Sequence, residues 1–115
     1  MAYQGSCHCG AVAFTVEGEP PAKAMSCNCS HCRRKGFLLT FVPAEQFTLD
    51  QGADQIETYD FNRHMIHHKF CRTCGTQAFA EGESGGSAIR AVNLRCVPAV
   101  DVDALELEKV DGASF

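Results

Sequence analysis

Seven of the eight cysteines fall into three short groups, and these groups are the part of the sequence best suited to chemistry. The groups are Cys7 with Cys9, the loop from Cys27 to Cys32, and Cys71 with Cys74. Cysteine thiolates bind zinc tetrahedrally at about 2.3 Å. The chain begins without the basic and apolar stretches of a signal peptide, which predicts a reducing, cytoplasmic location. Cysteines in such a compartment favour metal ligation over disulfide bonds.

Counting ligands divides the seven cysteines into a set of four and a set of three. The set of four draws two sulfurs from each end of the expected sheet and predicts a closed structural zinc; its members are Cys7, Cys9, Cys71 and Cys74. The set of three comes from one short loop and predicts a catalytic zinc with an open fourth position; its members are Cys27, Cys29 and Cys32. The sequence therefore predicts two zinc ions per chain.

Other interpretations of the cysteines stay open at this point. The set of four can form two disulfides, although neighbouring cysteines have poor geometry for bridging. The set of three can hold a purely structural zinc whose fourth ligand is Cys96, a histidine or water. Cys96 stands apart from the groups, and a lone cysteine is more typical of a small buried apolar side chain.

An open zinc with three thiolates favours sulfur chemistry over hydrolysis. Three thiolates leave the centre with a net charge of −1, so it polarises water less than a zinc held by three histidines. Such a centre still accepts one more soft ligand, and a substrate thiol that loses its proton on binding becomes a positioned nucleophile. The expected reaction is the addition of a thiol to a small electrophile, or the reverse cleavage of a carbon–sulfur bond.

Basic residues lie beside the proposed catalytic zinc. Arg33, Arg34 and Lys35 follow Cys32 directly, and in an acidic protein they would attract an anionic substrate. The alternative is an exposed basic turn. Asn93 and Arg95 flank the end of an expected strand, but the sequence gives no decisive reason to assign them to the metal side.

Three histidines near the third group can supply an acid–base group, because an imidazole titrates near neutrality. They are His64, His67 and His68. Alternation along a strand would place His67 and His68 on opposite faces, so that at most one points into a site. His8 and His31 lie between ligand cysteines, and we expect them to be spacers.

Composition and charge exclude several classes of protein. Apolar residues make up 45% of the chain and charged residues 21%, which is typical of one globular domain over residues 1–115. No apolar run approaches the roughly 20 residues of a membrane span. The net charge of −4 argues against a nucleic-acid binder. The sequence does not predict an oligomeric state.

The elements that position these residues are short strands with a period of two. Strands are expected at residues 11–16, 22–27, 37–42, 47–49, 56–61, 66–70, 77–80, 88–94 and 105–110. We expect residues 22–27 to pair with 11–16, and turns at residues 50–52, 81–83 and 84–86. Helical turns are expected only at residues 43–46 and 98–104. The pattern predicts an all-β sandwich or open barrel.

Four blocks of sequence carry a resemblance to a known family. They are GSCHCGAVAF at residues 5–14, CNCSHCRR at 27–34, FCRTCGT at 70–76 and VNLRC at 92–96. In this order they resemble the family of the glutathione-dependent formaldehyde-activating enzyme, which also includes centromere protein V. The resemblance implies a β-tent fold with the same structural and catalytic zinc sites. It also implies formation of S-(hydroxymethyl)glutathione from glutathione and formaldehyde, formally a carbon–sulfur lyase reaction.

Three functional hypotheses follow. The first is a zinc-dependent carbon–sulfur lyase that forms or cleaves a thiol adduct, with glutathione as the small-molecule partner. Cys27, Cys29 and Cys32 would hold the zinc, the segment from Arg33 to Lys35 would attract a carboxylate, and a histidine or water would carry the proton. The second is a non-enzymatic zinc module that binds a protein or nucleic acid. The third is a metal store or sensor.

Overall fold

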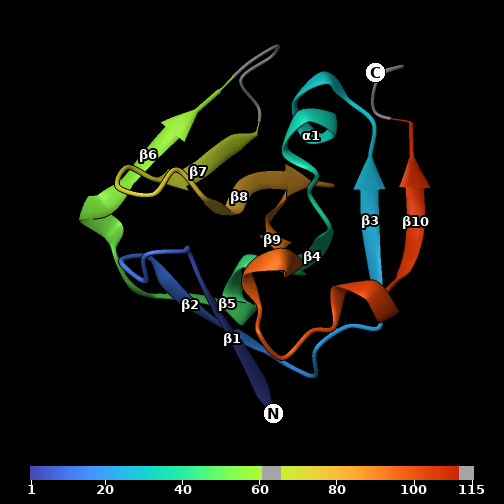
Figure 1. The fold of residues 1–115 in the computed structure, drawn as a ribbon, viewed down its shortest axis with the longest axis horizontal. Coiled ribbons are helices and arrows are strands. Elements are labelled where there is room, and N and C mark those ends of the chain that lie inside the picture. The colour runs from blue at the N-terminus through green and yellow to red at the C-terminus, as the bar shows by residue number, and fades with distance from the viewer. Residues whose placement is uncertain (61–65, 112–115) are drawn as a thin grey trace.

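A computed structural model describes residues 1–60 and 66–111, and most of its regular structure is β-strand (Figure 1). The strands are β1 (Ala2–Ser6), β2 (Ala13–Glu17), β3 (Lys23–Cys27), β4 (Leu39–Pro43), β5 (Phe47–Gln51), β6 (Ile56–Tyr59), β7 (His67–Cys71), β8 (Gln77–Ser84), β9 (Ser87–Asn93) and β10 (Glu106–Val110). The helices are α1 (Ser30–Lys35) and the 3-10 turns η1 (Ala44–Gln46), η2 (Ala53–Gln55), η3 (Leu94–Cys96) and η4 (Val102–Ala104). The prediction of an all-β fold is confirmed.

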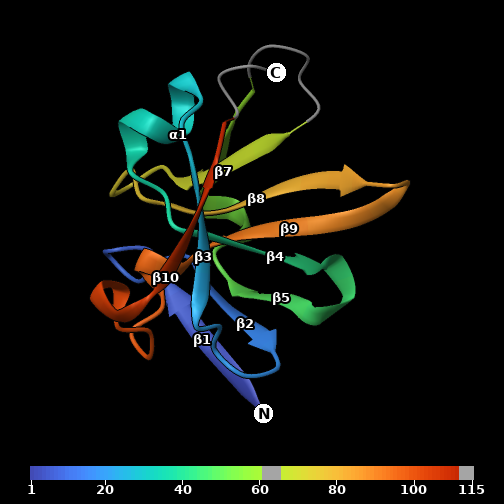
Figure 2. The same cartoon turned by 90° about the vertical axis from the view of Figure 1, so that its right-hand side faces the viewer.

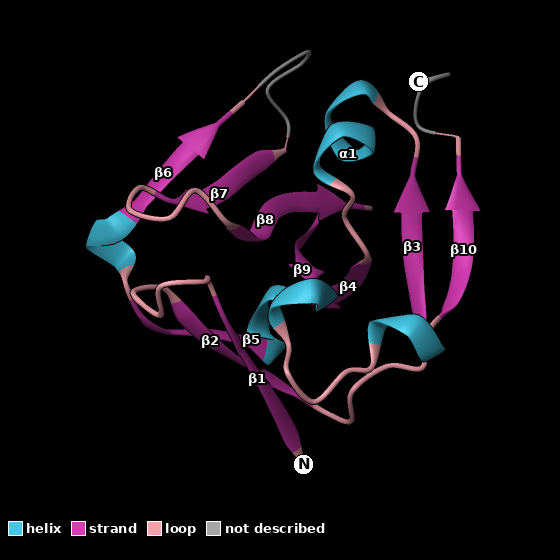
Figure 3. Ribbon diagram, in the orientation of Figure 1, coloured by secondary structure: helices cyan, strands magenta, loops and turns pink. Residues whose placement is uncertain are grey.

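The strands form two sheets. The smaller sheet has the order β1-β2-β5, and the larger has the order β10-β3-β4-β9-β8-β7-β6. Neighbouring strands are antiparallel except β10, which runs parallel to β3. β3 and β4 are joined by one residue pair, Met25 with Leu39, and Figure 2 shows β3 and β10 running steeply across the direction of β4, β8 and β9. The larger sheet is therefore bent into two wings, β3–β10 and β6–β7, and α1 lies between them (Figure 3).

The two faces of the larger sheet have different partners. Phe79 and Val92 pair across β8 and β9, and Phe79 packs on Phe47 of the smaller sheet with ring centroids 4.7 Å apart. Their neighbours Ala80 and Ala91 pair on the other face and pack in a second cluster with Cys32 of α1. Small alanine side chains allow the helix to approach the sheet closely. One face therefore builds the main core, and the other supports the Cys27 loop and α1.

The sequence did not predict β1 or α1. β1 pairs with β2 along its whole length, in a segment that carries little apolar alternation. α1 has six residues, too few for a period of 3.6 to be visible. Its ends are nevertheless local: the Cys29 sulfur accepts a hydrogen bond from the Cys32 amide, and Gly36 ends the helix with a φ of 69°.

The predicted pairing of residues 22–27 with residues 11–16 is wrong. β2 lies between β1 and β5 in the smaller sheet, and β3 lies between β10 and β4 in the larger one. The segment that contains Pro20 and Pro21 thus crosses between sheets. Successive strands are often neighbours, but a proline-rich connection of this length also permits a change of sheet.

The expected turn at residues 81–83 is also wrong. β8 continues through these residues to Ser84, because Glu81, Gly82 and Glu83 all pair with residues of β9. The turn at Gly85 and Gly86 is present, since both residues have positive φ angles between β8 and β9. The predicted helical turns are found as η1 and η4. The expected strand end at Phe61 lies outside the described residues.

Candidate metal and thiol site

Four cysteines from the two sheets meet at one point. The sulfurs of Cys7, Cys9, Cys71 and Cys74 all lie within 4.8 Å of one another. The Cys9 sulfur is 3.7 Å from both the Cys7 and the Cys71 sulfur. Tetrahedral zinc with Zn–S bonds of about 2.3 Å requires sulfurs about 3.8 Å apart. The set of four predicted from the spacing is therefore assembled, and its geometry fits zinc.

Two turns hold this four-sulfur cluster, one from each sheet. After β1, the Gly10 amide donates to the Cys7 carbonyl at 3.2 Å, and the Val12 amide donates to the Cys7 sulfur at 3.3 Å. After β7, the Gly75 amide donates to the Cys71 carbonyl at 2.8 Å. Gly10 and Gly75 have positive φ angles of 84° and 79°, which explains why glycine follows each pair of cysteines.

The surroundings of Cys71 and Cys74 favour thiolates, which are the form that binds metal. A hydrogen bond from the Cys74 backbone lowers the pKa of the Cys71 thiol. Burial acts to raise the pKa of Cys74, but hydrogen bonds from Thr76 and from the Cys9 backbone outweigh it and lower this pKa to about 5. At Cys9 a backbone hydrogen bond from Ala11 acts to lower the pKa, but burial and the neighbouring thiols outweigh it and raise this pKa to about 11. All four cysteines of the cluster are free thiols, and none is in a disulfide bond. The disulfide alternative is not what the structure contains.

The three remaining grouped cysteines form a second cluster at the start of α1. The sulfurs of Cys27, Cys29 and Cys32 lie within 4.8 Å of one another, and among the described residues no fourth cysteine, histidine or carboxylate joins them. Amide hydrogens point at two of the sulfurs: Cys29 donates to Cys27 at 3.5 Å and Cys32 donates to Cys29 at 3.3 Å. Burial acts to raise the pKa of Cys29, but the bond from the Cys32 amide and other hydrogen bonds outweigh it and lower this pKa.

The fit of a metal to this three-sulfur cluster follows from the donor chemistry. Burial raises the pKa of Cys32 most, and the nearby Cys29 and Cys27 thiols raise it further. Three thiolates this close repel one another when no cation lies between them. A bound zinc ion removes that repulsion, and three protein ligands leave one tetrahedral position for another group. Both clusters can therefore hold metal ions.

Cys96 belongs to neither cluster. It is buried in the main core with 9% exposure, and its sulfur lies 3.9 Å from the carbonyl of Gln77. Burial, with a smaller effect from Cys7 and Cys74, raises its pKa to about 11. Cys96 is thus a neutral core side chain beneath the four-sulfur cluster.

α1 divides the predicted basic segment between two cavities. Cys27, Cys32 and Arg33 line a cavity of about 540 Å³, which we call the sulfur-facing cavity. Arg34 and Lys35 line a second cavity of about 800 Å³, which we call the histidine-facing cavity. Residues one position apart on a helix point in different directions, which separates Arg33 from Arg34.

The histidine-facing cavity has an aromatic wall. His31 stacks on Tyr59 of β6 with centroids 5.5 Å apart, and it also contacts His68 of β7 at 4.0 Å. Burial and the charge of Lys35 lower the pKa of His31. The cavity is also lined by Gly75, which follows the four-sulfur cluster, so it extends between the two clusters.

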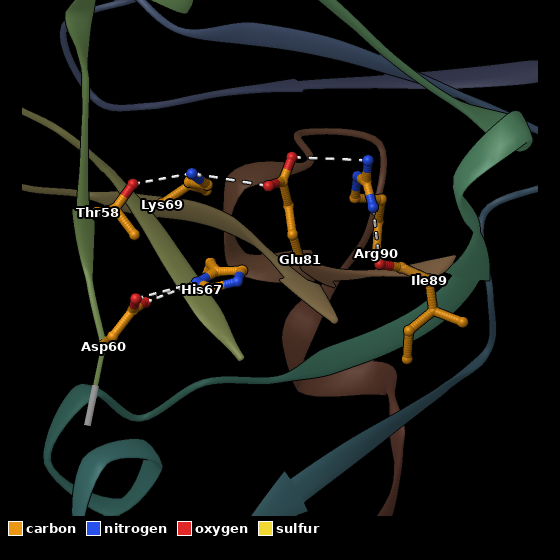
Figure 4. A network of polar contacts seen from close by, with 7 residues as sticks. All are labelled: Thr58, Asp60, His67, Lys69, Glu81, Ile89 and Arg90. Atoms are coloured by element: carbon orange, nitrogen blue, oxygen red, sulfur yellow. Dashed lines mark hydrogen bonds and ion pairs between the residues drawn. The ribbon is translucent and has the colours of Figure 1, made fainter. Parts of the chain in front are cut away.

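The predicted histidines have separate places. His67 contacts both carboxylate oxygens of Asp60 at 3.0 Å, beside a row of contacts in which Glu81 bridges Lys69 and Arg90 at 3.6 Å each (Figure 4). His68 lies buried against His31. The adjacent residues His67 and His68 thus point to different surroundings, as alternation along a strand predicts. His8 is exposed and, like His31, is not a member of either cluster. His64 lies outside the described residues.

A chain of buried polar side chains runs beneath α1, and of its members sequence reasoning named all but Gln77. His68, Gln77 and Asn93 are each at most 7% exposed. The Gln77 amide nitrogen lies 3.2 Å from His68 Nδ1, and Asn93 Nδ2 donates to the Gln77 carbonyl at 2.9 Å. Asn93 Oδ1 then accepts from the amide of Arg95, whose Nε donates to the Gly36 carbonyl at 2.8 Å. The chain therefore reaches α1 at both ends.

Comparison with known proteins agrees with this geometry. Residues 2–105 match the family model described as glutathione-dependent formaldehyde-activating enzyme. The chain belongs to this family. It is also similar to a crystal structure of a Rhodobacter sphaeroides protein from a structural genomics project. The two share 32% sequence identity and a TM-score of 0.81, and the match covers 93% of this chain and 99% of the other.

Membership of the formaldehyde-activating family supports a role related to glutathione and formaldehyde, and the two cysteine clusters are compatible with zinc. The resemblance stated from the four sequence blocks is confirmed. Within the described ranges, the structure contains no helix with the length and apolar character of a membrane span.

Proposed function

We propose that this family member is a zinc-dependent carbon–sulfur lyase that forms or cleaves S-(hydroxymethyl)glutathione. The observation that carries the proposal is the unequal division of the cysteines: four sulfurs in a cluster that joins the sheets, and three in a cluster that borders a cavity. Four ligands are typical of a structural site, and three of a site that takes substrate. We assign the structural zinc to the four-sulfur cluster and the catalytic zinc to Cys27, Cys29 and Cys32.

The reaction balances without an oxidant or reductant. The thiol sulfur forms a bond to the carbon of formaldehyde, the carbonyl π electrons move to oxygen, and that oxygen gains the proton that the thiol lost. Zinc, when bound, supplies a Lewis-acidic position that stabilises the substrate sulfur as a thiolate. The chain's own part is to hold that position: the amides of Cys29 and Cys32 fix two of the ligand sulfurs, and α1 fixes the third. A histidine or water carries the proton; His31 lies within the ligand loop, although its ring lines the histidine-facing cavity.

Replacing one ligand in each cluster tests the two assigned roles. In Cys29→Ser, we expect the zinc content to fall from two to one per chain, the far-ultraviolet circular dichroism to stay unchanged, and turnover to fall to the uncatalysed rate. In the matched variant Cys71→Ser, we expect a strongly lowered Tm, because the sheets lose their shared ligand set. Loss of both metals or global unfolding in Cys29→Ser would contradict separate roles.

The alternative of a non-enzymatic zinc module makes a different prediction. A module would have its second zinc closed by a fourth side chain, whereas the described residues provide three ligands there. The Cys29→Ser variant keeps only the zinc of the four-sulfur cluster. Its X-ray absorption spectrum therefore serves as the reference for a four-sulfur site. Subtracting it from the wild-type spectrum isolates the second zinc, and a change on adding glutathione supports the enzyme.

A further inference from the structure

The two cavities beside α1 differ in whether they reach the ligand sulfurs. The sulfur-facing cavity is lined by Cys27 and Cys32, whereas the histidine-facing cavity has none of the seven clustered cysteines among its described lining residues. A substrate thiol therefore reaches the three-sulfur cluster through the sulfur-facing cavity, which is the smaller of the two. Its volume of about 540 Å³ lies within the range of about 300–1,000 Å³ that is usual for small-molecule pockets.

Cations from three distant parts of the chain converge on the sulfur-facing cavity. Arg33 comes from α1, Arg95 from η3 and Lys109 from β10. One acidic residue, Asp111, also lines the cavity, and its carboxylate accepts a hydrogen bond from Asn28 at 3.0 Å. Among the described lining residues, three cations face one carboxylate, and a zinc held by three thiolates adds a charge of −1, so the cavity stays positive in a chain whose net charge is −4. A positive cavity raises the local concentration of anionic ligands.

Arg95 is the cation whose position is best fixed. Its Nε donates to the carbonyl of Gly36 at 2.8 Å, and its amide is held by Asn93 at 3.1 Å. A guanidinium has five donors in a planar fork, and this bond to Gly36 uses one of them. Planar forks bind carboxylates with two parallel hydrogen bonds, so an ordered arginine at the cavity wall suits a carboxylate ligand.

We infer that Arg33, Arg95 and Lys109 determine specificity by binding the carboxylates of an anionic thiol whose sulfur reaches Cys27 and Cys32. This inference rests on the proposed function and narrows it to thiols that carry more than one carboxylate, of which glutathione is one. Of the basic segment from Arg33 to Lys35, the inference assigns substrate binding to Arg33 alone. Arg34 lies on the other cavity, and its Nη1 donates to the carbonyl of Ser30 at 2.9 Å.

Adjacent arginines on different cavities provide a matched test. S-methylglutathione keeps both carboxylates but has no free thiol, so its binding reports on the cavity without any chemistry. In isothermal titration of the zinc-loaded chain, we expect Arg33→Gln to weaken binding about tenfold, or about 1.4 kcal/mol, because a charge-assisted hydrogen bond to a carboxylate is lost. Arg34→Gln removes the same charge from the next position and should change the dissociation constant by less than about twofold.

Lys109→Gln supplies a second variant, because Lys109 lies on β10 and its loss leaves α1 intact. It should also weaken binding several-fold. Equal effects of Arg33→Gln and Arg34→Gln, a larger effect of Arg34→Gln, or no binding of S-methylglutathione to the wild-type chain at millimolar concentration would overturn the inference. Zinc content and circular dichroism of each variant show whether a loss of binding reflects a loss of structure.

Kinetics separate this inference from the proposed function. With formaldehyde, we expect Arg33→Gln to raise KM for glutathione about tenfold with little change in kcat, and to leave KM for the neutral thiol 2-mercaptoethanol unchanged. If the wild-type chain turns over neither thiol, the proposed function fails. The binding of S-methylglutathione then still tests whether the sulfur-facing cavity binds carboxylates. If glutathione turns over but Arg33→Gln raises both KM values equally, the function stands and the assigned specificity fails.

Discussion

His68 is the histidine whose surroundings most clearly fix its charge. It is 7% exposed, and burial lowers its pKa to about 4. The charges of His31, Lys35 and His67 act in the same direction, and Asp60 acts against them. The folded protein therefore keeps this imidazole neutral at pH 7. A neutral ring suits a position beneath α1, where a charge would lie in a nearly dry environment.

The lowered pKa of His68 predicts a loss of stability in mild acid. The unfolded chain binds a proton at this histidine near pH 6.5 and the folded chain only near pH 4, so the unfolded state gains protons first as the pH falls. The stabilising contribution is complete above about pH 6.5 and is lost between pH 6.5 and 4. Between pH 7 and 5 we expect the wild type to lose about 2 kcal/mol more unfolding free energy than His68→Gln.

Urea unfolding of both proteins at matched pH and zinc content measures this difference. Acid also releases zinc from thiolates, but that effect is common to the wild type and the variant and cancels in the comparison. Parallel pH profiles would show that His68 does not carry the lost stability.

At the residue scale, local chemistry could be predicted from the sequence and long-range placement could not. The spacing of Cys27, Cys29 and Cys32 fixes their meeting, because five residues of chain leave few alternatives. The position of Lys109 beside them depends on β10 pairing in parallel with β3, a contact across about 80 residues. No local pattern indicates that contact, so Lys109 was missed and Arg95 was left unassigned.

At the scale of elements, the end of β5 supports the loop that carries Cys7. Gly52 follows β5 with a φ of 95°, and a side chain there would collide with the backbone of Ala11 and Val12. The amide of Val12 donates to the Cys7 sulfur, so a displaced loop would disturb the four-sulfur cluster. Gly52 is thus required for space as well as for its backbone conformation.

Comparison of two glycines separates these requirements. Gly18 also has a positive φ, 107°, but a side chain there would meet nothing within 4 Å. Gly18→Ala should cost about 1 kcal/mol for its conformation alone. Gly52→Ala should cost at least about 2 kcal/mol more and should weaken zinc binding at the four-sulfur cluster. Thermal unfolding and zinc release to a chromogenic chelator measure both effects. Equal destabilisation by the two substitutions would contradict the steric role of Gly52.

The elements that the sequence predicted are those with strong alternation and clear ends. β2 alternates buried and partly buried residues from Ala13 to Val16. β9 ends at Asn93, and the glycine pair before it closes the hairpin with β8. β8 itself extends further than predicted because Gly82 pairs with Ile89 inside the ladder instead of breaking it. Glycine in a strand is ambiguous from sequence, since it marks a turn in one context and a tolerated strand position in another.

At the scale of the whole molecule, the four-sulfur cluster is a link between the two sheets. Cys7 and Cys9 follow β1 of the smaller sheet, Cys71 is the last residue of β7 in the larger sheet, and Cys74 lies in the turn after β7. The sulfurs of Cys9 and Cys71 are 3.7 Å apart although they are separated by 62 residues of chain. A metal bound here stabilises the folded state, because the four sulfurs are brought together only when the two sheets are folded. The three-sulfur cluster needs only the short loop from Cys27 to Cys32.

This difference predicts that the two metals leave the protein in separate steps with unequal consequences. Metal binding at the four-sulfur cluster needs both sheets in place, so it is coupled to folding and we expect it to contribute about 5 kcal/mol or more. Metal binding at the three-sulfur cluster needs only one short loop and contributes less. We therefore expect a chelator to remove the metal of the three-sulfur cluster first, with the chain still folded, and to remove the other only as the sheets separate. Removal of both should lower Tm by about 20 °C or more, because 1 kcal/mol corresponds to about 4 °C for a chain of this size.

Calorimetry with zinc analysis at each chelator concentration measures this loss of Tm, and the Cys29→Ser variant gives the Tm of the intermediate that has lost one metal. Release of both metals in one step that coincides with unfolding would show that the three-sulfur cluster is as much a part of the structural framework as the four-sulfur cluster.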